Sequence, residues 1–105
     1  MADKDVAERV QKLTLIEQNL SNLLGQKQQF QNQLFEVGNA LSELDKSPKA
    51  YKIVGSIMVQ TDKADLKTEL SSKKEVLELR MKNIEKQEEQ LQQKAKSIQD
   101  EVFNK

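Results

Sequence analysis

The chain has 105 residues, of which 32% are charged, 36% are hydrophobic and only 4% are aromatic. That length allows one domain, and the balance is typical of an exposed coiled coil rather than of a packed globule. The 17 basic and 17 acidic residues cancel, which argues against a nucleic-acid-binding protein or a polybasic membrane anchor. Histidine and cysteine are both absent, so we expect no disulfide, no transition-metal site and no histidine acid–base catalyst.

Targeting and cofactor signals are also missing from the sequence. No stretch approaches the roughly 18 apolar residues of a membrane span, and the first residues lack the apolar core of a signal peptide. We therefore expect a cytoplasmic protein that makes no contact with a membrane. The chain has no glycine-rich phosphate loop, and no carboxylate pair has a reason to be buried, so we predict no cofactor, no catalytic residue and no enzymatic activity.

The first predicted element is a long helix over about residues 4–45. Its apolar residues recur at alternating steps of three and four, which is the spacing of a coiled-coil seam. Pro48 disfavours helical geometry in the residue before it, so the helix is expected to end just ahead of it. With position a at Val6, Leu13, Leu20, Lys27, Leu34 and Leu41, position d holds Arg9, Ile16, Leu23, Phe30, Val37 and Leu44.

A short β-hairpin is predicted next, over about residues 51–61. Gly55 can adopt the positive φ of a type I′ or II′ turn, which makes Gly55 and Ser56 a two-residue connection between two strands. On that pairing one face of the hairpin carries Lys52, Val54, Ile57 and Val59. The other face carries Tyr51, Ile53, Met58 and Gln60.

The second helix is predicted over about residues 63–103, with Asp62 as its N-cap. We assign position a of its heptads to Leu70, Leu77, Ile84, Leu91 and Ile98. Position d is then polar after Leu66, with Lys73, Arg80, Gln87, Lys94 and Glu101. Apolar residues at position e (Met81, Ala95 and Val102) partly replace them, so this seam is expected to be the weaker one. Glu69 and Lys73 are expected to form an i,i+4 ion pair.

Together these elements predict a mainly α fold: a long antiparallel two-helix coiled coil with a short central β-hairpin, in one domain over residues 1–105. The connection between the helices contains the hairpin, which lets the second helix fold back along the first. Phe30 is then expected to lie near Arg80, and Val6 near residues 102–103.

Two apolar regions are candidate interaction sites. Both faces of the hairpin are largely apolar and both of its edges are unpaired, so we expect it to join hairpins from other chains. The end of the coil where the termini meet also carries apolar residues, which either bind a partner or only close the coil. The hairpin set is Tyr51, Ile53, Val54, Gly55, Ile57, Met58 and Val59, and the coil-end set is Val6, Val10, Leu13, Ile98, Val102 and Phe103.

The order and spacing of several motifs resemble the β-class subunits of prefoldin, especially the archaeal type. The hairpin motif is Tyr-Lys-Ile-Val-Gly at residues 51–55, followed by Val59, Thr61 and Lys63. The flanking helices match as well, at residues 26–34, 40–44, 77–80 and 84–89. The resemblance covers about residues 15–100.

This resemblance implies a fold, an assembly and a function. Prefoldins are ATP-independent co-chaperones in which two α-class and four β-class subunits join their hairpins into a β-barrel that carries six coiled coils. The ends of the coils hold non-native proteins and deliver them to a group II chaperonin. By that likeness the hairpin set is expected to mediate assembly, the coil-end set to contact clients, and the charged second helix to help bind the chaperonin.

Two other functions stay open on the sequence alone. A structural coiled-coil adaptor could assemble through the same hairpin and bind one folded partner. An enzyme or enzyme subunit is disfavoured by the absence of histidine and cysteine and by the lack of an interior for an active site.

Overall fold

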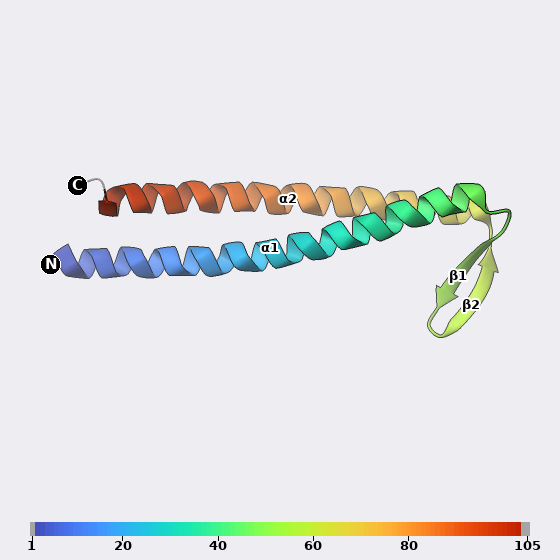
Figure 1. Ribbon diagram of the computed structural model, residues 1–105, viewed down its shortest axis with the longest axis horizontal. Helices are drawn as coiled ribbons and strands as arrows, with labels where there is room; N and C mark the ends of the chain where they lie inside the picture. Colours follow the sequence, from blue (N-terminus) through green and yellow to red (C-terminus); the bar gives the residue numbers. More distant parts are fainter. Residues whose placement is uncertain (1, 104–105) are drawn as a thin grey trace. The chain divides into compact units, whose positions relative to one another are not determined.

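The computed structural model describes residues 2–103, with side chains from residue 4 onward. The elements follow in the order α1 (Ala2–Lys46), β1 (Ala50–Val54), β2 (Ile57–Thr61) and α2 (Lys63–Phe103) (Figure 1). The first helix is two residues longer at its start and one longer at its end than the periodicity predicts. The hairpin begins one residue earlier than predicted, and the second helix has the predicted bounds.

The chain divides into two compact units. The terminal unit pairs residues 2–29 of α1 with residues 81–103 of α2, and the hairpin unit comprises residues 30–80. Within each unit the two helical segments run antiparallel. Among the described residues, no helix is long and apolar enough to cross a membrane.

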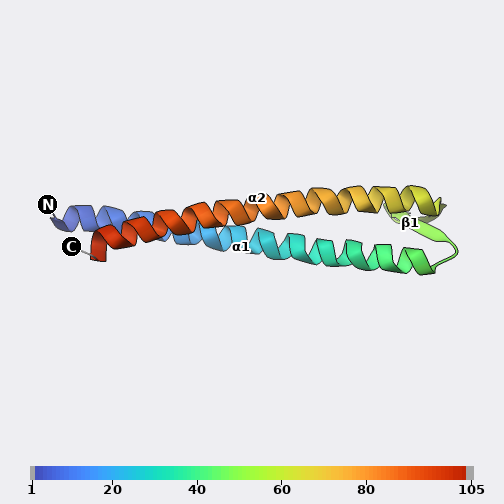
Figure 2. The same ribbon diagram turned by 90° about the horizontal axis from the view of Figure 1, so that it is seen from above.

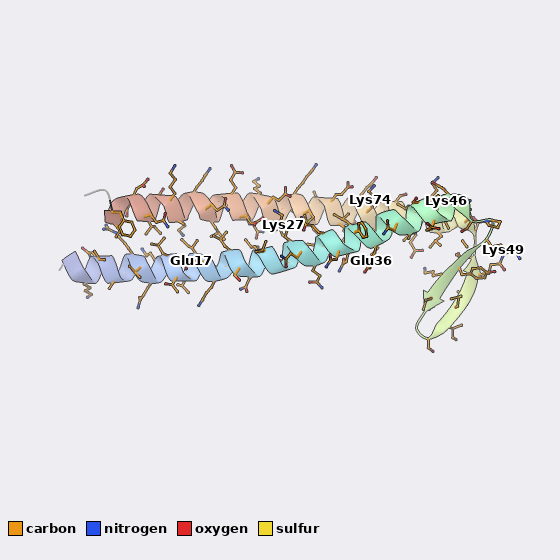
Figure 3. The ribbon with its side chains drawn as sticks, in the orientation of Figure 1. Glu17, Lys27, Glu36, Lys46, Lys49 and Lys74 are labelled. Carbon is orange, nitrogen blue, oxygen red and sulfur yellow. The ribbon has the colours of Figure 1, made fainter. Side chains whose placement is uncertain are left out.

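The terminal unit has a narrow apolar seam, because two helices alone cannot enclose a wide core. Its buried side chains are Ile16, Leu23, Met81, Ile84 and Ile98. Two ion pairs of 3.4 Å connect its helical segments, Arg9 with Glu101 and Lys27 with Glu88. The predicted polar interruption of the first seam, Lys27, therefore faces a carboxylate on the opposite helix (Figure 3).

The hairpin unit is held by a similar seam, whose buried residues are Val37, Leu44, Ala50 and Leu77. The guanidinium of Arg80 lies 5.9 Å from the centre of the Phe30 ring, which confirms the predicted neighbourhood of these two residues. Lys67 pairs with the Asp45 carboxylate at 3.2 Å. Figure 2 shows the two helical segments of this unit side by side.

The predicted heptad assignment of α2 was wrong: the residues that it places at a occupy position d, and those that it places at e occupy position a. Lys73, Arg80 and Lys94, which the assignment places at d, are exposed, as are Gln87 and Glu101. The helix instead faces its partner through the residues assigned to a and to e, so the true repeat has Lys74, Met81, Glu88, Ala95 and Val102 at a, and Leu70, Leu77, Ile84, Leu91 and Ile98 at d. Apolar residues then recur four and three apart along the helix, and the seam is interrupted only by Lys74, which is exposed, and by Glu88.

The helix ends next to the hairpin are closed by local hydrogen bonds. The Asp62 carboxylate accepts from the backbone N–H groups of Ala64, at 2.8 Å, and Asp65, at 3.2 Å, which confirms it as the N-cap of α2. At the end of α1 the N–H of Ser47 donates to the carbonyl of Leu44 at 3.3 Å. Only residues 47–49 and residue 62 then separate the hairpin from the two helices, so its strands start close to both of them.

The hairpin has the predicted register, with Tyr51 opposite Gln60 and Val54 opposite Ile57. Gly55 has a φ of 61°, and no other described residue has a positive φ. A positive φ at the first central position and not at the second defines a type II′ turn, so the structure selects this turn over type I′. Both faces consequently carry the residues that the sequence assigns to them.

Candidate functional site

The hairpin exposes almost all of its apolar side chains. The exposed fraction is 69% for Ile53 and 56% for Val54, and Ala50 at the base is the one hairpin residue that is buried. We call this the hairpin surface; its members are Tyr51, Ile53, Val54, Ile57, Met58 and Val59. A contiguous exposed apolar surface of this kind is typical of an interaction site.

The backbone of the hairpin adds hydrogen-bonding groups to this surface. In a hairpin with a two-residue turn, Val54 and Ile57 exchange hydrogen bonds, and the pattern alternates along the strands. The N–H and C=O groups of Tyr51, Ile53 and Met58 therefore point away from the partner strand, as do those of Gln60. Each edge can accept a further strand, and an isolated two-stranded hairpin is marginally stable without one.

The coil-end set lies in the terminal unit and is only partly exposed. Phe103, at 76%, and Val10, at 49%, are exposed, and Val6 is exposed as well. Leu13 and Val102 are half-buried between the helices. Ile98 is 9% exposed and belongs to the buried seam. We call Val6, Val10 and Phe103, with the half-buried Leu13 and Val102, the coil-end surface.

A groove of about 620 Å³ lies between the two helical segments of the terminal unit. Its apolar lining residues are Leu15, Ile16, Leu91 and Ile98, of which Ile16 and Ile98 are buried and Leu15 is exposed. Charged side chains of both signs and one amide also line it: Asp5, Glu8, Arg9, Lys12, Asn19, Lys94 and Glu101. The Arg9–Glu101 ion pair belongs to this lining. No local sequence pattern predicts this groove, because its two walls come from segments far apart in the chain, residues 5–19 and 91–101.

Further apolar residues outside the seams are exposed. These residues are Leu15, Leu24, Phe35, Val76 and Leu79. Among the described residues, no three His, Cys, Asp or Glu side chains gather in a way that could hold a metal ion. No polar side chain in the described part of the chain is buried without a hydrogen-bond partner. The arrangement offers apolar contact and strand pairing.

Comparison with known proteins gives the family of this fold. The sequence profile described as "Prefoldin subunit" matches residues 7–105. The chain belongs to the prefoldin family. Prefoldins are chaperones, and their subunits assemble with other prefoldin subunits.

The similar proteins are β-class prefoldin subunits of archaea. The prefoldin subunit beta of Methanothrix thermoacetophila is 38% identical over 100 residues, which cover 92% of this chain and 83% of that protein. The prefoldin subunit beta of Sulfurisphaera tokodaii is 38% identical over 94 residues, covering 87% and 75% of the two chains. The crystal structure of the prefoldin beta subunit from Thermococcus strain KS-1 matches with a TM-score of 0.88 at 33% identity, over 94% of this chain and 90% of that one. This agrees with the family resemblance that the motifs indicate and with the fold of two helices and a hairpin.

Proposed function

We propose that this chain is the β-class subunit of an ATP-independent, hexameric, cytoplasmic co-chaperone with two α-class and four β-class subunits. The complex captures unfolded proteins at the ends of its coiled coils and delivers them to a group II chaperonin. The observation that carries the proposal is the exposed hairpin surface, since an apolar element with two open strand edges requires partners. The β-class names of the similar archaeal proteins support the choice of subunit class.

Assembly, in this proposal, occurs through the hairpin. The side chains of Tyr51, Ile53, Val54, Ile57, Met58 and Val59 become buried between subunits, while Gly55 shapes the turn that sets their register. Strand edges of neighbouring hairpins pair, so that the ring of hairpins closes into a barrel without free edges. The proposed partners are two copies of an α-class prefoldin subunit and further copies of this chain.

Client binding occurs at the coil-end surface in this proposal. Val6, Val10 and Phe103 offer exposed apolar side chains, and Leu13 and Val102 offer their half-exposed edges. Ile98 contributes by holding the two helices together, because it is buried in the seam. One such surface binds weakly, but several of them on a common base raise the affinity through effective concentration. Differently sized clients can then be held without a shaped pocket.

Release to the chaperonin needs no nucleotide in this mechanism. A weakly held client exchanges freely, so a chaperonin with a larger apolar surface can compete for it. The exposed charged residues of α2 are proposed to assist the chaperonin encounter through electrostatic steering.

The experiment that tests this function is the aggregation of a chemically unfolded, unrelated protein on dilution, followed by light scattering without nucleotide. The chain is added together with an α-class prefoldin subunit. Suppression near one complex per client is the expected result, and replacing Val10 and Phe103 by Ser should weaken it. No suppression by a fully assembled complex would contradict the proposal.

A structural adaptor that binds one folded partner is the second candidate. The groove in the terminal unit favours it, because a fixed pattern of both charge signs around apolar lining residues suits one defined surface better than many unfolded chains. Several unrelated clients in the aggregation assay separate the two candidates. A holdase suppresses the aggregation of most of them, whereas an adaptor suppresses none.

A further inference from the structure

The direction in which the hairpin leaves the helices is set by few contacts. The hairpin is connected to α1 by residues 47–49 and to α2 by Asp62, and both connections start at its base. Along one face of β1 the exposed fraction rises from 3% at Ala50 to 56% at Val54. Packing therefore holds the base of the hairpin and leaves the turn end free to swing.

Between the base and the turn end of the hairpin, an ion pair connects the hairpin to a helix. The Lys52 ammonium donates to both carboxylate oxygens of Glu69, at 2.9 Å and 3.1 Å, and so joins strand β1 to helix α2. Lys52 lies on the same hairpin face as Ala50, two residue pairs closer to the turn. Glu69 makes this contact rather than the predicted i,i+4 pair with Lys73. Its partner therefore lies 17 residues away in the sequence.

We propose that the Lys52–Glu69 ion pair is a positioning contact that fixes the direction of the hairpin relative to α2 and thereby the geometry in which hairpins of different subunits meet. This inference rests on the proposed role of the hairpin in assembly. Its occupant is the hairpin of a second prefoldin subunit, since the exposed face with Ile53 and Met58 offers apolar side chains together with open strand edges. The ion pair keeps this face turned outward by tying the opposite face, through Lys52, to the helix.

A weak contact is sufficient for this role because its effect multiplies in an assembly. The two side chains are 42% and 55% exposed, and exposed ion pairs shift a two-state population by up to about fivefold. Affinity falls in proportion to the fraction of molecules in the binding-competent geometry. A contact between two hairpins that both need the correct direction then loses up to about 25-fold when the ion pair is absent from both.

The hairpin direction can be measured directly in the isolated chain. The chain has no cysteine, so S56C in the turn and S72C on an exposed position of α2 give two unique thiols for spin labels, both within the hairpin unit. Their distance distribution should be narrow in the parent and broader in E69Q and K52Q. The charge-swapped variant K52E/E69K should regain the narrow distribution. High salt should broaden it in the parent but leave E69Q unchanged, since salt screens an exposed pair.

A matched control separates positioning from a general loss of charge. Lys67 also lies on α2 and forms an ion pair of 3.2 Å with Asp45, but this pair joins the two helices without touching the hairpin. K67Q should leave the distance distribution as in the parent. A distribution in E69Q identical to that of the parent, or an equal broadening in K67Q, would overturn the inference.

Assembly provides the second readout. In the complex with an α-class prefoldin subunit, followed by sedimentation over a dilution series, E69Q should weaken assembly about 5- to 25-fold, K52E/E69K should restore it, and K67Q should leave it unchanged. Unchanged assembly by E69Q in spite of a broadened distribution would also overturn the inference. If the parent forms no complex at all, the proposed function fails, whereas the spin-label distances still decide whether the ion pair fixes the hairpin.

Discussion

The hairpin surface and the coil-end surface are both apolar, but they differ in how the apolar groups are arranged. Six of the ten strand residues of the hairpin are exposed apolar side chains, and they are contiguous on both faces. In the terminal unit the exposed apolar residues Val6, Val10 and Phe103 are separated by charged residues, and their neighbours Leu13 and Val102 are half-buried. The first arrangement favours a permanent interface, and the second favours weak and exchangeable contacts.

The backbone accounts for the rest of the difference. The hairpin offers open N–H and C=O groups at two edges, which give a partner a defined register. The helices of the terminal unit satisfy their own backbone groups, so only side chains are available there. Strand pairing is directional and side-chain contact is not, which supports the proposed role of the hairpin surface in assembly and of the coil-end surface in binding clients of varied sequence.

The largest expected effect comes from placing a charge in the hairpin surface. Val54→Asp buries an unpaired carboxylate at every interface that the hairpin forms, which costs about 3 kcal/mol or more per site. We expect assembly to be lost at micromolar concentration while the helical content of the subunit is retained. Sedimentation measures the first and circular dichroism the second.

Leu79→Asp is the matched control for that variant. Leu79 is as exposed as Val54 but lies on α2 outside the hairpin. The Asp at this position remains in water, so assembly should be unchanged. Equal assembly of the Val54 variant and the parent would show that the hairpin surface is not the interface.

The next effect should appear only in client binding. Replacing Val10 and Phe103 by Ser removes the two most exposed apolar groups of the coil-end surface and should reduce client affinity several-fold per subunit, because each lost burial costs about 1 kcal/mol. Assembly should be unaffected. Leu24→Ser, another exposed position of the terminal unit, is the control in the same aggregation assay. A loss of assembly, or an equal loss of holding in the control, would contradict this division of roles.

Much of this architecture could be predicted from sequence patterns, and each prediction has a physical reason. A 3.5-residue period over some 40 residues has one structural solution, so both helices were predicted to within two residues. The hairpin register followed from the turn, since Gly55 readily adopts the positive φ that a two-residue connection needs. The N-cap at Asp62 followed from the preference of carboxylates for free N–H groups at a helix start.

The features that escaped prediction depend on partners distant in sequence. The heptads of α2 were misassigned because Lys74 and Glu88 interrupt the apolar stripe, and the role of Glu88 becomes clear only once Lys27 lies opposite. The Lys52–Glu69 contact depends on the direction of the hairpin, which no local pattern specifies. The groove depends on the pairing of the two chain ends.

A smaller effect is expected from a substitution in the turn of the hairpin. Gly55→Ala forces a side chain into a φ of 61°, which costs about 1–2 kcal/mol. The melting temperature of the assembled complex should fall. Gly25→Ala is the opposite control, because Gly25 lies within α1 with open space at its Cβ position, so Ala there should stabilise by about 0.5–1 kcal/mol. A Gly55→Ala complex as stable as the parent would show that the turn conformation is not required in the assembly.

The smallest effect concerns the polar position in the seam of the terminal unit. The Lys27 and Glu88 side chains are 27% and 16% exposed, so their ion pair is partly shielded from water. A double-mutant cycle with Lys27→Leu and Glu88→Leu should give a coupling of about 0.5–1 kcal/mol in thermal unfolding, because each single change leaves the other charge without its partner. The double variant should be at least as stable as the parent, since Leu packs well in such a seam. What it should lose is an ion pair that, together with Arg9–Glu101, distinguishes the native alignment of the two helices from an alignment shifted by a heptad. A double variant less stable than both single variants would mean that the ion pair stabilises the coil rather than selecting its register.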